Sequence, residues 1–74
     1  MIHARPDYDR IQDPLIPKDE PVFLIRAQDM LSVDVVLYWA SRNEAVGGDP
    51  KLTQLARQHA ELMKKWPKKK KADL

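Results

Sequence analysis

Gly47, Gly48, Asp49 and Pro50 constrain the fold of this 74-residue chain more than any other feature. Glycine adopts the left-handed backbone conformation that ends many helices, and aspartate accepts hydrogen bonds from the free amides that begin the next helix. Proline has the φ angle required at the first helical position. One helix therefore ends where another begins, and the sequence predicts an αα-hairpin over residues 32–66.

The first hairpin helix is predicted to run from Ser32, as its N-cap, to about Val46, with Asp34 in the first turn. A helix that is apolar over most of its circumference packs between several partners. This helix carries more apolar surface than one neighbouring helix covers, which favours a homodimer or a higher oligomer. The apolar residues that spread over its faces are Val33, Val35, Val36, Leu37, Tyr38, Trp39, Ala40 and Val46.

The second helix, from Pro50 to Trp66, has a single apolar stripe and a polar opposite face. We expect the stripe to be the buried face, and we expect His59 within it to be a core histidine that bonds to a backbone group. The stripe comprises Leu52, Leu55, Ala56, His59, Leu62, Met63 and Trp66.

The run from Val22 to Ile25 is the most apolar stretch, and a run this short can form a helix or a strand. Acidic residues and Pro21 directly before it suit the start of a helix, so we favour a short helix. The β-branched residues in the run suit a strand instead. The chain offers no second candidate strand, so a strand here would have to pair with another copy.

The expected fold is all-α, with three parts along the chain. Residues 1–20 form an extended, proline-rich N-terminal arm, because prolines at this density disfavour a regular helix or a central strand. Residues 21–66 form the helical domain that contains the hairpin. Residues 67–74 form a disordered lysine-rich tail, because Pro67 cannot continue the helix.

The N-terminal arm has two interpretations. It orders only partly, as chain termini often do, or it docks as an extended segment into an apolar groove of its own chain or of a second chain. The apolar residues available for docking are Tyr8, Ile11, Leu15 and Ile16.

The net charge of +2 conceals an uneven distribution. Residues 1–63 contain seven Lys and Arg and ten Asp and Glu, whereas residues 64–74 contain six Lys and one Asp. A nucleic-acid-binding domain presents basic residues on its folded body, and this body is acidic. The tail is then a solvated end or, in the sharper interpretation, a weak hook for nucleic acid or an acidic protein surface. The lysines concerned are Lys68, Lys69, Lys70 and Lys71.

A domain of this size buries a limited core and usually depends on disulfides, a metal or oligomerisation. The sequence has no cysteine and only two histidines, which excludes disulfides and a zinc cage and leaves oligomerisation. No segment has the pattern of a signal peptide or the roughly 20 apolar residues of a membrane span. We therefore expect a cytoplasmic protein without membrane contact.

No pattern of residues in the sequence carries chemistry. Asp7, Asp9 and Asp13 lack the glycine and the final glutamate of a calcium-binding EF-hand loop. Neither a catalytic triad nor a phosphate-binding glycine motif has support in the spacing of residues. We expect no catalytic residue, no cofactor and no metal, and hence a protein that is not an enzyme.

Two arginines are the polar candidates for contact with a partner. Arg26 forms an ordinary ion pair with Asp29, or presents its planar guanidinium to a carboxylate or phosphate of a partner. Arg42 lies beside Trp39 on the outer side of the first helix, and such aromatic and arginine side chains often anchor interfaces. The predicted interface residues are Phe23, Arg26, Tyr38, Trp39 and Arg42.

The run DEPVFLIRAQD over residues 19–29, followed by VVLYWA over residues 35–40, resembles a family of short uncharacterised proteins carried by bacteriophages and prophages. The resemblance includes no catalytic motif and does not extend to the basic tail. It implies a stoichiometric accessory protein, including one that binds a bacterial defence component.

Two classes of function follow. In the first, the protein is a small helical interaction module that self-associates and holds a protein partner through apolar surface and arginines. In the second, it binds an anionic ligand, either nucleic acid through the tail or a nucleotide held between subunits near Arg26 and Arg42.

Overall fold

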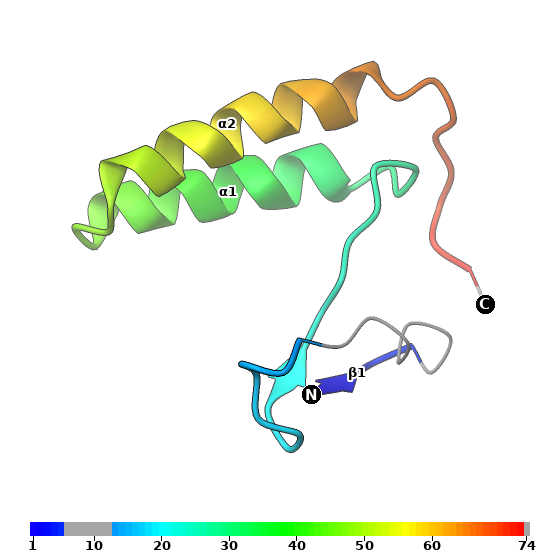
Figure 1. The fold of residues 1–74 in the computed structure, drawn as a ribbon. Helices are drawn as coiled ribbons and strands as arrows, with labels where there is room; N and C mark the ends of the chain where they lie inside the picture. The colour runs from blue at the N-terminus through cyan, green and yellow to red at the C-terminus, as the bar shows by residue number, and fades with distance from the viewer. Residues whose placement is uncertain (6–12, 74) are drawn as a thin grey trace.

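A computed structural model describes residues 1–5 and 13–73 of the chain. Its elements in order are β1 (Ile2–His3), β2 (Pro21–Val22), α1 (Ser32–Ala45) and α2 (Pro50–Lys65). The two helices lie side by side and antiparallel, and the pair of short strands lies apart from them (Figure 1). The predicted αα-hairpin in a mostly helical small domain is confirmed.

The turn between the helices is built as its residues predict. Gly47 has a φ of 78°, and its amide donates to the carbonyl of Glu44 at 3.1 Å. The carboxylate of Asp49 accepts from the amide of Lys51 at 2.9 Å as the N-cap of α2, and Pro50 is the first helical residue.

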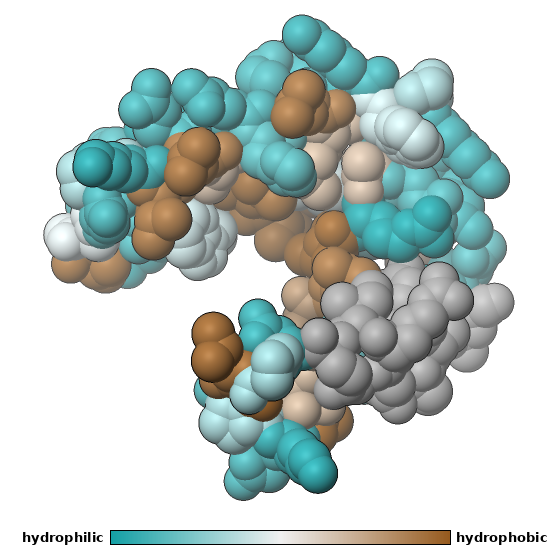
Figure 2. Space-filling view, in the orientation of Figure 1, coloured by the Kyte–Doolittle hydropathy of each residue, from teal (hydrophilic) through white to brown (hydrophobic). Residues whose placement is uncertain are grey.

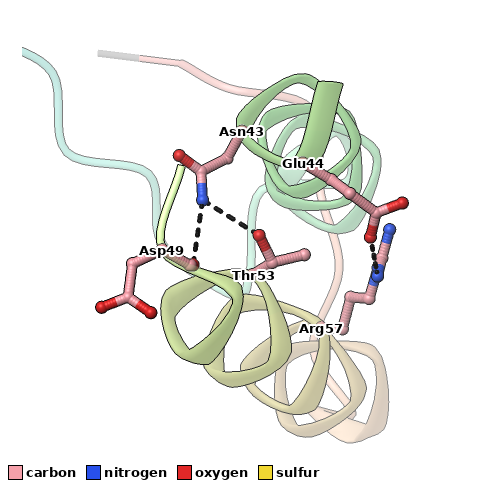
Figure 3. A network of polar contacts seen from close by, with 5 residues as sticks. All are labelled: Asn43, Glu44, Asp49, Thr53 and Arg57. Carbon is pink, nitrogen blue, oxygen red and sulfur yellow. Dashed lines mark hydrogen bonds and ion pairs between the residues drawn. The ribbon is translucent and has the colours of Figure 1, made fainter. Parts of the chain in front are cut away.

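Asn43 holds the turn together, although its role has no local signal in the sequence. Its carbonyl accepts from the amide of Gly48 at 2.8 Å, and its side-chain amide donates to Thr53 Oγ1 at 2.9 Å. The same amide nitrogen lies 3.4 Å from the carbonyl oxygen of Asp49 (Figure 3). One side chain of α1 thus connects the loop with the first turn of α2.

The prediction that Ser32 caps α1 is wrong. Ser32 is the first helical residue and is fully buried, and its hydroxyl donates to the carbonyl of Ala27 at 3.4 Å. Asp29 organises the approach to the helix instead. Its carboxylate accepts from the amide of Leu31 at 2.8 Å, and its carbonyl accepts from the amide of Ser32 at 2.9 Å.

Small side chains form the contact between α1 and α2. Among the described residues, Ala40, Ala60 and Met63 are the buried apolar residues, and Ser32 and Thr53 are the buried polar residues. Small residues in a contact allow two helix backbones to approach closely. The hairpin is therefore closed by a narrow contact that contains few large apolar side chains.

The apolar stripe predicted to be the buried face of α2 is mostly exposed. Leu52, Leu55, Leu62 and Trp66 are between 51% and 64% exposed, and His59 is exposed too. The expectation of a core histidine is therefore wrong. The reason is that α2 contacts α1 through its smaller residues, including Thr53, Ala56 and Ala60, which lie about a quarter of a helical turn away from the large ones.

The segment from Val22 begins as a strand, so the preferred helix over this run is wrong. β2 pairs in parallel with β1, with Ile2 opposite Pro21 and His3 opposite Val22. The strand partner is therefore the N-terminus of the same chain and not another copy. The ring of His3 stacks on Phe23 with 5.4 Å between the ring centroids.

The N-terminal arm returns to the body of the chain through this pairing. The amide of Ile2 donates to the carbonyl of Glu20 at 2.8 Å, and a turn at Asp13 follows the undescribed segment, with 3.0 Å between Ile16 N and Asp13 O. Leu15 is 89% exposed and Ile16 is half-buried. Tyr8 and Ile11, the other two residues considered for docking, lie outside the described residues.

We predict that Gly48→Ala destabilises the hairpin more than Gly47→Ala. A methyl group at Gly48 would lie 2.0 Å from Asn43 Oδ1, so Asn43 would have to give up its bond to Thr53, at a cost of about 1–3 kcal/mol. A methyl group at Gly47 meets no atom within 4 Å, and only its positive φ costs free energy, about 1 kcal/mol.

Urea unfolding of both variants measures this difference. In an Asn43→Ala background, Gly48→Ala should add little further cost, because the clashing side chain and its bond to Thr53 are already absent. Equal free energies of unfolding for the two glycine variants would contradict the prediction.

Candidate interaction surface

Each hairpin helix carries two lines of residues at the three- and four-residue spacing of a helical contact. We call the line between α1 and α2 the inner seam. It comprises Ser32, Val36, Ala40 and Asn43 on α1, and Thr53, Ala56, Ala60 and Met63 on α2. All eight residues are buried or half-buried, which identifies this line as the contact within the hairpin.

The second line, which we call the outer seam, is exposed on both helices. Its apolar members are between 42% and 71% exposed, and its two polar members are Arg42 and His59. The outer seam comprises Val35, Trp39, Arg42 and Val46 on the α1 side, and Leu52, Leu55, His59, Leu62 and Trp66 on the α2 side.

Residues of α1 and α2 that line a common groove show which side of each helix belongs to the same face of the hairpin. An open groove on one side is lined by Leu37 and Glu44 from α1 and by Gln54, Arg57 and Glu61 from α2. Arg57 and Glu44 pair across it at 2.9 Å, with side chains that are 45% and 64% exposed (Figure 3). Because the outer-seam residues lie on the opposite flank of each helix, they share the other face of the hairpin.

Apolar surface is correspondingly abundant on the outside of the molecule. Figure 2 shows apolar patches over the two helices and along the inner edge that faces the strand pair. Large apolar side chains exposed together on one face of a small protein are typical of a site for another protein or a ligand. The outer seam is therefore the strongest candidate for an interaction surface.

The structure distributes the predicted interface residues over two regions. Trp39 and Arg42 belong to the outer seam, and Tyr38, which is 70% exposed, lies next to them on α1. Phe23, also 70% exposed, and Arg26 lie on the segment between β2 and α1. Leu55 and Leu62 are further interface candidates, although the sequence predicts them to be buried. They recur along α2 with the same helical spacing as Ala56 and Met63, so spacing alone does not distinguish the exposed line from the buried one.

The two predicted arginines have no ion-pair partner among the described residues. Asp29, the expected partner of Arg26, uses its carboxylate at the start of α1. Arg26 lines a small cavity of about 70 Å³ together with Arg5 and Lys70, but also with Asp29 and Asp73. This volume is far below the roughly 300–1,000 Å³ of small-molecule pockets, and the acidic groups offset the basic ones. Arg42 is not among the residues that line it.

The lysine-rich tail lies against the segment that leads into α1, where we expected it to be disordered. The amide of Lys70 donates to the carbonyl of Gln28 at 2.8 Å, and the carbonyl of Lys70 accepts from the amide of Met30 at 2.9 Å. The Lys69 ammonium donates to the carbonyls of Ala27, at 2.7 Å, and Met63. All the acceptors are backbone carbonyls, which any sequence offers, and this is why the lysine composition did not predict these contacts.

The Lys70 side chain bonds to Asp73 at 2.9 Å. This hydrogen bond and the attached positive charge lower the pKa of Asp73 below its ordinary value. The contact therefore adds stability at neutral pH that is lost as the pH falls through the lowered pKa in the acidic range. Lys68, Lys69 and Lys71 remain exposed.

Residues 1–5 and 13–73 contain no group of three or more histidine, cysteine or acidic side chains placed to hold a metal ion. Neither helix has the length and the apolar composition to cross a membrane, over the same described part of the chain. No family model, curated protein or solved structure matches this chain. The proposal for its function therefore rests on its surface.

We predict that Lys69→Met loosens the tail, because the variant loses two bonds from one ammonium group to backbone carbonyls. Hydrogen exchange at the amides of Met30 and Lys70 should become faster, since these amides report the pairing between the tail and the segment before α1. Lys68→Met is the matched control and should leave both rates unchanged. Unaltered protection in Lys69→Met would show that the ammonium does not hold the tail.

Proposed function

We propose that this chain is a small non-enzymatic interaction protein that self-associates and acts stoichiometrically by binding a protein partner. The observation that carries the proposal is the amount of apolar surface that a single copy leaves in contact with water.

The total exposed area is large for the mass of the chain. A compact monomer of 8.6 kDa exposes about 4,700 Å², whereas this chain exposes 6179 Å². Its radius of gyration is 13.6 Å, compared with roughly 11 Å for a compact domain of the same length. The molecule is correspondingly thin, with extents of 31 × 30 × 15 Å. A thin body with this much surface supports a role in which other chains complete the fold.

Large apolar side chains contribute to this exposed surface. Only Ala40, Ala60 and Met63 are buried apolar residues in the described part of the chain, while large apolar side chains are exposed on both helices. Leaving a large apolar side chain in water forgoes about 1.5–3 kcal/mol relative to full burial. Association with protein recovers part of this free energy, which favours binding to protein over a solitary monomer.

The segment that precedes α1 is the candidate surface for a different protein. Phe23, Met30 and Leu31 are each exposed by more than half, and Arg26 on the same segment provides a planar donor group. Aromatic and arginine side chains dominate the binding energy of many interfaces. The resemblance to phage proteins supports a partner in the cytoplasm of a bacterial host, including a component of a defence system.

Copurification of the tagged full chain from bacterial cells tests this proposal. We expect one host protein at a near-stoichiometric ratio, retained at high salt because apolar contacts are insensitive to screening. Phe23→Ser should lose this protein, whereas Leu37→Ser, on the polar side of the hairpin, should retain it. Retention in both variants would exclude Phe23 from the interface, and the absence of any stoichiometric partner would contradict the proposal.

A second candidate function is binding of an anionic ligand, and the exposed side chains of Lys68, Lys69 and Lys71 favour it. Under this alternative, DNA binding falls steeply with salt and weakens in a variant with Lys68→Gln and Lys71→Gln. A nucleotide held near Arg26 and Arg42 would instead raise the melting temperature of the protein, an increase that Arg26→Gln would abolish. Binding without a salt slope, and no shift on adding mononucleotides or cyclic dinucleotides, would rule out this class.

A further inference from the structure

We propose that the outer seam is the self-association surface, and that two copies pack their outer seams together into a four-helix bundle with two-fold symmetry. This inference deepens the proposed function, because it assigns one face of the hairpin to a second copy of the chain. The segment before α1 then remains available to a different protein.

The spacing of the outer seam is that of a bundle contact. On α1 the seam residues follow one another by four, three and four positions, and on α2 by three, four, three and four positions. This alternation keeps residues on one side of a helix and is the pattern of a and d positions in bundles and coiled coils. A helix inside a four-helix bundle contacts two neighbours, and each helix here has one seam for the hairpin and a second that is unoccupied.

Contacts across the hairpin show which seam residues lie at the same level. Asn43 bonds to Thr53, and Glu44 pairs with Arg57, so positions in α1 and α2 that add to about one hundred are neighbours. Val46 is therefore level with Leu52, Trp39 with His59, and Val35 with Leu62. The seams of the two helices form successive layers of one continuous face.

The area of this face suits a stable dimer. Its seven apolar side chains, at 42–71% exposure, present on the order of 800 Å² per copy, so two facing copies cover about 1,600 Å², the size of a standard interface. Burial on that scale also removes about half of the surface by which the single chain exceeds a compact monomer.

A second copy of the chain is the partner that covers the α1 part and the α2 part of the outer seam at the same time. A single helix from another protein would lie between the α1 and α2 parts of the outer seam and leave the outer edges of both parts in water. A second hairpin presents an outer seam of the same length and the same residues on its own two antiparallel helices. A two-fold axis brings these identical surfaces together. The groove with the Arg57–Glu44 pair then faces outwards on both copies.

Arg42 and His59 are the two polar residues within the seam. Single polar residues at such positions reduce the stability of a bundle and restrict its register and its number of chains. The long side chain of Arg42 can also extend to the edge of the contact and keep its charge in water. Both residues therefore favour one closed dimer over indefinite association of apolar faces.

Sedimentation equilibrium of the full chain over the micromolar range tests this inference. We expect twice the 8.6 kDa mass of the chain. Leu55→Glu and Trp39→Glu should each weaken the dimer by about tenfold or more, because they place a charge in the middle of the contact. Leu37→Glu is the matched control, since Leu37 is 40% exposed on the polar side, and it should remain dimeric.

Tryptophan fluorescence provides a measurement that requires no substitution. The chain has two tryptophans, Trp39 and Trp66, and both lie in the outer seam. Dilution that dissociates the dimer should expose both indoles to water and shift their emission to longer wavelength, in step with the loss of mass. This readout keeps the inference testable even where a glutamate variant fails to fold.

A wild-type monomer with emission that does not change on dilution would overturn the inference. So would a dimer that persists in both Leu55→Glu and Trp39→Glu, or a mass well above that of a dimer. In each case, copurification of a host protein that depends on Phe23 would leave the binding of a protein partner intact, although a wild-type monomer would also contradict the proposed self-association. Loss of that copurification alongside an intact dimer would contradict the binding function and leave the seam assignment standing.

Discussion

Contact between α1 and α2 through small side chains is the constraint on which the rest of this molecule depends. Ala40 and Ala60 have almost no contact with water, while the leucines that directly precede Thr53, Ala56 and Met63 on α2 are more than half exposed. Because small residues allow two backbones to approach closely, they lie between the helices, and the larger residues lie on the exposed flank. The hairpin is thus closed at the expense of a large internal core.

The turn and the two ends of the chain secure this narrow contact. Asn43 connects the loop to the first turn of α2, and Asp49 satisfies the free amides there. The tail from Pro67 returns to the segment before α1 through Lys70, so that the beginning of the hairpin and its end are joined. The N-terminus pairs with Pro21 and Val22 in a separate strand pair. Hydrogen bonds, many of them to backbone groups, therefore provide much of the order that apolar packing does not.

The local features of this fold could be read from the residues, and the choice of buried face could not. Asp49 and Pro50 predict the start of α2 by their own chemistry, and Gly47 predicts the end of α1. His59 and Leu55 have the same helical spacing as a buried stripe, so spacing alone assigned them to the core. A rotation of α2 about its axis by about 100°, the angle between successive helical residues, moves that stripe into water. Only the packing of α2 against α1 determines this rotation.

The strand pair and the tail illustrate the same division between local and distant information. The sequence by itself determined two helices, the turn that joins them, and an excess of apolar residues over what so short a chain can bury, because these follow from local backbone preferences and composition. The tertiary structure alone decided that Ile2 pairs with Pro21, that Lys70 lies beside Asp29, and that small residues lie between the helices. Those outcomes depend on contacts between residues that are far apart in the sequence. Neither residue type nor spacing along the chain specifies which of these residues come into contact.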